Sequence, residues 1–153
     1  HDLVVIDCSP LLQDVTLAFL DQSDVVLTVL TLEITNIKNI RQFLALVDQL
    51  GYPDDKVQLL LNRADSGYGI RLHDVESSIG RKISHSVVSD GRTVVYALNR
   101  GVPFVVAARQ ARVSEDVVKL AKTIVAGEQV QPGQVPARAA QRKSGGLFQW
   151  RAH

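Results

Sequence analysis

The 153-residue chain lacks the features that mark disulfide-bonded, metal-binding, exported or membrane-spanning proteins. Its single cysteine, Cys8, cannot form an internal disulfide, and no Cys or His residues have the spacing of a metal site. It shows no charged-then-apolar leader and no apolar run near the roughly 20 residues that a membrane span needs. We therefore expect a protein of a reducing, cytoplasmic compartment.

Methionine is also absent, and the chain enters an apolar run at residues 3–6 directly after His1 and Asp2. This start favours the interpretation that the sequence is part of something longer. With 46% hydrophobic and 22% charged residues, the composition is that of one globular domain with a sizeable core.

Acidic residues are absent after Glu128, whereas Arg138, Arg142, Lys143 and Arg151 lie there. The remaining body is mildly acidic, which disfavours nonspecific DNA binding by its general surface. The tail, residues 128–153, has no periodic apolar face and is predicted to be a flexible, basic extension of a body spanning residues 1–127. It is either a solvated end or a contact for DNA, anionic lipid or an acidic partner.

Apolar runs of strand length recur at residues 3–6, 25–30, 57–61 and 83–88. Helical patterns separate them, the clearest over residues 35–50, and the last is predicted to start at an N-cap, Ser114. Short Val- and Leu-rich runs are typical of strands buried on both faces of a sheet. The alternation predicts an α/β fold with a doubly wound, mostly parallel sheet and flanking helices.

Ligands of open parallel sheets bind beyond the carboxyl ends of the strands. Polar residues follow every apolar run, at residues 7–10, 31–33, 62–65 and 89–91. Asp7 has the form of an acid that holds the hydration shell of Mg²⁺ beside nucleotide phosphates, although a turn or cap residue is an equal alternative.

Four motifs in order carry a resemblance to a known family: LVVIDCSP at 3–10, SDVVLTVLT at 23–31, LLLNR at 59–63 and ALNRGVP at 97–103. The series resembles the C-terminal half of the MinD/ParA-type P-loop ATPases, and within them the CpaE/TadZ branch of pilus assembly. The resemblance spans about residues 2–126. It implies a P-loop NTPase-like fold whose N-terminal half is missing, with ATP and Mg²⁺ bound between the two protomers of a homodimer.

The resemblance implies that Asp7 is the catalytic and metal-linked acid, binding Mg²⁺ directly or through water. Asp7, Cys8, Ser9 and Pro10 would form the switch that senses the γ-phosphate. Ser9 departs from the first proline that is common in this branch, which puts the switch in question.

The resemblance also implies a base-binding side. Asn62 would accept and donate hydrogen bonds at the adenine edge, with Arg63 beside it, and the loop with Ser89 and Asp90 would pass near the base. The alternatives are that Asn62 is a turn residue bonded to its own backbone and that Arg63 is a solvated charge. Val88 departs from the proline that is common before this loop.

No glycine is followed by lysine, so the Walker A loop that holds the phosphates is absent. We therefore predict that this chain alone neither binds ATP tightly nor hydrolyses it, and that ATPase activity would belong to the intact protein. The implied function is positioning of pilus or secretion machinery, together with other components of that system. Such a protein would be cytoplasmic, or peripheral to the membrane through its basic tail, or at a cell pole.

Three other interpretations stay open at different weights. A non-hydrolysing scaffold with a degenerate ATPase fold is favoured slightly by Ser9 and Val88. A response-regulator receiver domain would need further acids and a lysine at strand ends, where Asn62 and Val88 stand. A DNA-partitioning ATPase would need a basic body, which the excess of acidic residues argues against.

Overall fold

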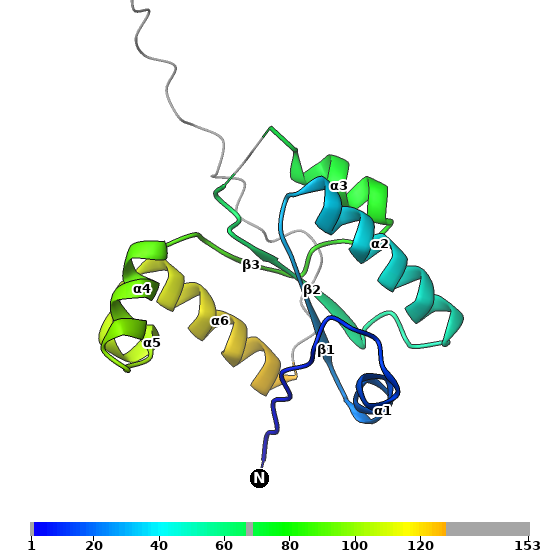
Figure 1. The fold of residues 1–153 in the computed structure, drawn as a ribbon, viewed down its shortest axis with the longest axis horizontal. Coiled ribbons are helices and arrows are strands. Elements are labelled where there is room, and N and C mark those ends of the chain that lie inside the picture. The colour runs from blue at the N-terminus through cyan, green and yellow to red at the C-terminus, as the bar shows by residue number, and fades with distance from the viewer. Residues whose placement is uncertain (1, 67–68, 128–153) are drawn as a thin grey trace, which may run out of the picture.

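The structure is a computed structural model that describes residues 2–66 and 69–127 (Figure 1). Its centre is a parallel sheet of three strands in the order β1-β2-β3. The strands are β1 (Val26–Leu30), β2 (Val57–Asn62) and β3 (His85–Val87). β2 is the central strand, because it is hydrogen-bonded to β1 along one edge and to β3 along the other.

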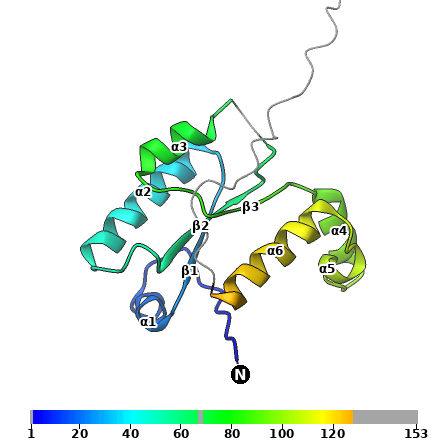
Figure 2. The same cartoon turned by 180° about the vertical axis from the view of Figure 1, so that it is seen from behind.

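Helices cover both faces of this sheet, as Figures 1 and 2 show from opposite sides. One group comprises α1 (Asp14–Gln22), α2 (Ile34–Gln49) and α3 (Leu72–Ile79). The other group comprises α4 (Gly91–Asn99), α5 (Phe104–Ala107) and α6 (Arg112–Ala126). The predicted α/β class with a parallel sheet and flanking helices is confirmed.

The alternation of side chains along β2 divides the core into two parts. Leu59 and Leu61 are buried in the larger cluster, which includes residues of α1, α2 and α3. Leu60, between them, is buried in a smaller cluster with Val87 and with Val113 of α6. Successive side chains of a strand point to opposite faces, so an unbroken apolar run is what a strand covered on both faces requires.

α2 follows the helical spacing that the sequence predicts. Ile40, Leu44 and Val47 are buried against the sheet at intervals of four and three residues. Gly51, at φ +73°, follows the helix in the left-handed conformation that commonly ends helices. The prediction of an amphipathic crossover helix over residues 35–50 is confirmed.

The first predicted strand is wrong. Residues 3–6 are not a strand and are exposed, with Val5 85% accessible. A strand needs a hydrogen-bonded neighbour, and within residues 2–66 and 69–127 no backbone hydrogen bond joins this run to β1, β2 or β3. Its apolar composition alone therefore does not make it part of the sheet.

The predicted N-cap of the last helix is also wrong. α6 begins at Arg112 after Ala111, and Ser114 lies fully buried inside its first turn. The Ser114 hydroxyl donates to the carbonyl oxygen of Phe104 at 3.2 Å, so it ties α6 to the short helix α5. The sequence reasoning had missed α5.

The tail predicted for residues 128–153 falls outside the described residues. Among the helices of residues 2–66 and 69–127, none combines the length and the apolar composition needed to cross a membrane.

His85 is a buried titratable residue between the sheet and α6. The residue is 8% accessible, and its Nε2 lies 2.8 Å from Oε1 of Gln58 on the neighbouring strand. Burial, and then the positive charge of Lys119, lower the pKa of His85 below its ordinary value of 6.5. The folded protein therefore favours the neutral imidazole.

We predict that stability falls as the pH is lowered through and below about 6.5, because there the unfolded chain binds a proton that folded His85 resists. Denaturant titrations at pH 7.5 and 5.0 measure this, and His85→Gln should reduce the loss of unfolding free energy at pH 5.0. His73→Gln is the matched control, because the His73 side chain is exposed. An equal acid loss in the wild type and the His85→Gln variant would contradict the prediction.

Candidate functional site

The carboxyl end of β2 is a tight turn built by Asn62 and Arg63. Asn62 is the last residue of the strand, and its Oδ1 accepts a hydrogen bond from the backbone N–H of Arg63 at 3.0 Å. Arg63 has φ +55°, an uncommon conformation for a residue with a side chain. The Ser66 hydroxyl donates to the Arg63 carbonyl at 2.6 Å and closes the turn.

The loop after β2 is bonded to the loop after β3. The backbone N–H of Ser89 donates to Oδ1 of Asp65 at 2.6 Å, and the N–H of Ala64 donates to the carbonyl of Val87 at 3.0 Å. Asn62 also pairs with Val87 in the ladder. The structure thus brings the two predicted segments, 62–63 and 89–90, together at one edge of the sheet.

Asp90 serves as the N-cap of α4. Its Oδ1 accepts from the backbone N–H of Thr93 at 3.0 Å, which satisfies a donor that the first turn of a helix leaves unpaired. The hydrogen bonds from Thr93 lower the pKa of Asp90, and the charge of Arg92 adds to the effect. Asp90 is therefore ionised at neutral pH and holds the start of α4 in place.

β1 also ends at this edge, because all three strands are parallel, and the loop that follows β1 begins there. There the backbone N–H of Thr31 donates to Oδ1 of Asn36 in the first turn of α2, at 3.0 Å. This contact fixes the link from β1 to α2.

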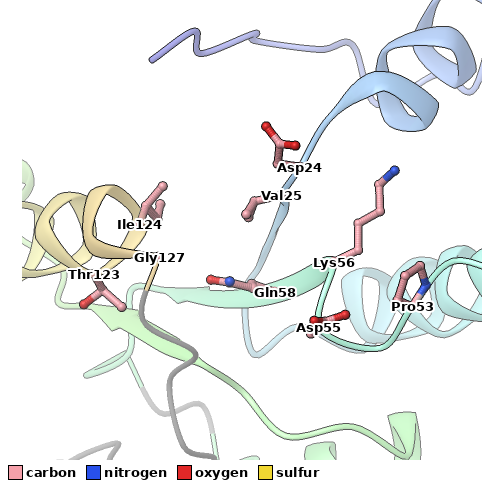
Figure 3. Close-up of a pocket in the computed structure, with 9 residues that line it drawn as sticks. All are labelled: Asp24, Val25, Pro53, Asp55, Lys56, Gln58, Thr123, Ile124 and Gly127. Atoms are coloured by element: carbon pink, nitrogen blue, oxygen red, sulfur yellow. The ribbon is translucent and has the colours of Figure 1, made fainter. Parts of the chain in front are cut away.

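A cavity of about 320 Å³ lies at the opposite edge, where the strands begin. Figure 3 shows its lining from the start of β1 (Asp24, Val25), the start of β2 (Lys56, Gln58) and the end of α6. The carbonyl end of α6 and the carboxylate of Asp24 both disfavour the binding of a phosphate group. Lys56 donates to the carbonyl of Asp21 and lies over the ring of Tyr52. This cavity is therefore not where nucleotide phosphates would bind, and the carboxyl edge remains the candidate on chemical grounds.

Solved structures of a ParA family ATPase and of the cell division protein MinD share this arrangement of elements. The chain is 25% identical to a ParA family ATPase from Chlorobium tepidum TLS, with a TM-score of 0.67 over 72% of this chain and 46% of that one. It is 17% identical to the cell division protein MinD of Aquifex aeolicus, with a TM-score of 0.62 over 80% of this chain and 51% of that one. A MinC:MinD complex from Aquifex aeolicus matches with 16% identity and a TM-score of 0.63, over 80% and 51%.

The chain has a MinD/ParA-type fold. It spans about half the length of the solved structures that it matches. No protein-family model and no curated protein sequence matches it. The likeness therefore rests on the arrangement of strands and helices.

Val88 directly precedes the loop that carries Ser89 and Asp90. Its backbone N–H donates to Oδ2 of Asp116 on α6 at 3.0 Å. A proline here would have no N–H to donate. Where the resemblance predicts a proline, Val88 instead uses its N–H to bind a carboxylate 28 residues along the chain. No local sequence pattern signals this contact.

Asp7 lies in a segment without regular secondary structure. Residues 7–10 are exposed and belong to no strand or helix, and Figures 1 and 2 place the first residues near the end of the sheet where β1 begins. The expectation that Asp7 ends a sheet strand is wrong for the described chain. Its catalytic and metal roles, and the switch role of Cys8, Ser9 and Pro10, stay predictions.

The described residues do not by themselves fit Mg²⁺-ATP. Within residues 2–66 and 69–127, no group of three His, Cys, Asp or Glu side chains could hold a metal ion. Mg²⁺ bound through one or two carboxylates also needs substrate phosphates as ligands. The chain has no glycine-lysine pair to hold such phosphates.

We predict that Asp116→Ala lowers the free energy of unfolding by about 1–3 kcal/mol, because it leaves the half-buried N–H of Val88 without its acceptor. Glu115→Ala is the control, since it removes the same charge from an exposed neighbour on α6. Urea denaturation of both variants measures the difference. Equal effects of the two substitutions would show that the Asp116 contact carries no specific stability.

Proposed function

We propose that this chain is the C-terminal half of the ATP-binding domain of a MinD/ParA-type positioning protein. The observation that carries the proposal is the pair of hydrogen-bonded loops after β2 and β3, which gathers Asn62, Arg63, Ser89 and Asp90 at the carboxyl edge. This is the edge at which open α/β sheets bind ligands. The likeness to a ParA family ATPase and to MinD supports ATP as the ligand.

The contacts at this edge refine the role proposed for Asn62. Its Oδ1 accepts from the Arg63 N–H, as the turn interpretation predicts. The side-chain NH₂ keeps two donors. Asn62 would then donate to an acceptor nitrogen of adenine while its oxygen holds the turn, so the structural and binding roles are compatible. Arg63 would lie beside the base, and Ser89 and Asp90 would shape the loop that passes near it.

The metal side of the site would come from the intact protein. Asp7 would serve Mg²⁺ there, and residues 7–10 would form the switch, as their sequence motif indicates. In this proposal ATP and Mg²⁺ are cofactors of the longer protein, and two copies associate as a homodimer in response to nucleotide. Hydrolysis would require a phosphate-holding loop, and the 153 residues contain no glycine-lysine pair to form one.

The proposed role is localisation of pilus or secretion machinery, with other components of that system as partners. The support is the motif series, which resembles the CpaE/TadZ branch. The acidic residues of the body weigh against DNA as the cargo. The site of action would be the cytoplasm, the membrane periphery or a cell pole, with the basic tail as the membrane contact.

A second candidate is a scaffold that keeps the fold but does not respond to ATP. The observation in its favour is that Ser9 and Val88 replace prolines common in the family, while residues 7–10 are exposed. Such a module would dimerise and bind partners without nucleotide.

Calorimetry and light scattering with ATP and Mg²⁺, on this chain and on the longer protein, separate these proposals. We predict that the longer protein binds ATP and dimerises with it, and that this chain does neither. Asp7→Ala should abolish nucleotide-dependent dimerisation, and Asn62→Ala should weaken ATP binding about tenfold, equivalent to about 1.4 kcal/mol.

Asp54→Ala is the control for both variants, because Asp54 is exposed and lies in the turn before β2, away from the carboxyl edge. A longer protein that is dimeric and indifferent to ATP would replace the ATPase proposal with the scaffold. Tight ATP binding by the present chain would contradict the inference that its phosphate-binding elements are missing.

A further inference from the structure

Two carboxylates hold the backbone that leads into the loop after β3. The N–H of Val88 donates to Oδ2 of Asp116 on α6 at 3.0 Å. The N–H of the next residue, Ser89, donates to Oδ1 of Asp65 at 2.6 Å. Asp65 lies in the turn after β2, so the two acceptors belong to different elements. Consecutive N–H groups of this segment are therefore bonded to two separate parts of the molecule.

The turn that carries Asp65 is itself held at several points. At its start, Oδ1 of Asn62 accepts from the N–H of Arg63 at 3.0 Å. The carbonyl of Arg63 then accepts from both the N–H and the hydroxyl of Ser66, at 2.9 and 2.6 Å. Asp65 thus lies within a hydrogen-bonded turn that begins at Asn62, and its carboxylate can set the position of the group that it binds.

The bond between Asp65 and Ser89 is a strong link between the two loops. A hydrogen bond to a carboxylate is about twice as strong as one between neutral groups. Among residues 2–66 and 69–127 no basic side chain forms an ion pair with Asp65, so no competing charge draws its carboxylate away from Ser89. On the other side of Ser89, Asp90 caps α4. Ser89 therefore lies between two anchored points.

We propose that Asp65 is a positioning residue of the proposed nucleotide site. Its carboxylate holds the loop with Ser89 and Asp90 at a set position relative to the Asn62 turn before any ligand binds. The cost of ordering loops weakens binding, so a loop that is already ordered raises affinity. The identity of the ligand rests on the proposed function, whereas the holding of the loop rests on the contacts of Asp65 alone.

Two other roles for Asp65 make different predictions. If its negative charge touched the ligand directly, Asp65→Asn would weaken binding as much as Asp65→Ala. If its contact only stabilised the fold, Asp65→Ala would lower the free energy of unfolding and leave the ligand affinity of the folded protein unchanged. The positioning role requires an acceptor oxygen at this place, and an asparagine side chain still supplies one.

Amide hydrogen exchange of the present chain, followed by NMR, tests the loop contact. We predict that Asp65→Ala accelerates exchange of the Ser89 amide about fivefold or more, and that Asp65→Asn accelerates it only about twofold. The Val88 amide keeps its acceptor, Asp116, and should change little in either variant. Asp24→Ala is the matched control, because it removes an exposed carboxylate beside the cavity at the opposite edge (Figure 3). Unchanged Ser89 exchange in Asp65→Ala overturns the proposal.

Calorimetric titration of the longer protein with ATP and Mg²⁺ tests the positioning role, with circular dichroism to check that each variant is folded. We predict that Asp65→Ala weakens ATP binding about tenfold, whereas Asp65→Asn and Asp24→Ala retain most of the affinity. Equal losses in Asp65→Asn and Asp65→Ala, or wild-type affinity in Asp65→Ala, overturn the proposal. If the wild-type longer protein does not bind ATP, the proposed function fails, and Ser89 exchange alone decides whether Asp65 holds the loop.

Discussion

The structure depends on the hydrogen-bonded ladders that β2 makes along both of its edges. Val57 to Leu61 pair with β1, and Leu60 to Asn62 pair with β3. Only backbone groups form the two ladders, and successive side chains of β2 point to opposite faces of the sheet. Leu59 and Leu61 are therefore buried on one face and Leu60 on the other. Helices must then cover both faces, which gives the two groups α1–α3 and α4–α6.

The same parallel arrangement creates the candidate site. Parallel strands end at one edge, so the polar residues after β2 and β3 meet there without any further requirement. Side-chain contacts then hold the loops: Asp65 accepts from the Ser89 N–H, Asp90 caps α4 and Asp116 accepts from the Val88 N–H. Backbone groups that a loop would otherwise leave unpaired are satisfied by carboxylates.

Periodicity was sufficient to predict β1 to β3, α2 and the class of fold, because those elements bury the apolar faces that their spacing defines. It was insufficient for residues 3–6, since strand formation depends on a neighbouring strand as well as on composition. It also missed the contacts of Asp65 and Asp116, which join residues 24 and 28 positions apart. Ser114 was mistaken for a cap because its acceptor, the Phe104 carbonyl, lies on a helix that the sequence did not reveal.

This chain folds around β2, which brings together the two loops proposed for the base side of a nucleotide site, while residues 3–6 lie outside the sheet. Amide hydrogen exchange, measured residue by residue by NMR, tests it most directly. The account predicts the slowest exchange for Leu59 to Leu61, measurable protection of the Ser89 amide, and fast exchange across residues 3–6. Protection of residues 3–6 comparable to that of β2, or rapid exchange of β2 itself, would contradict it.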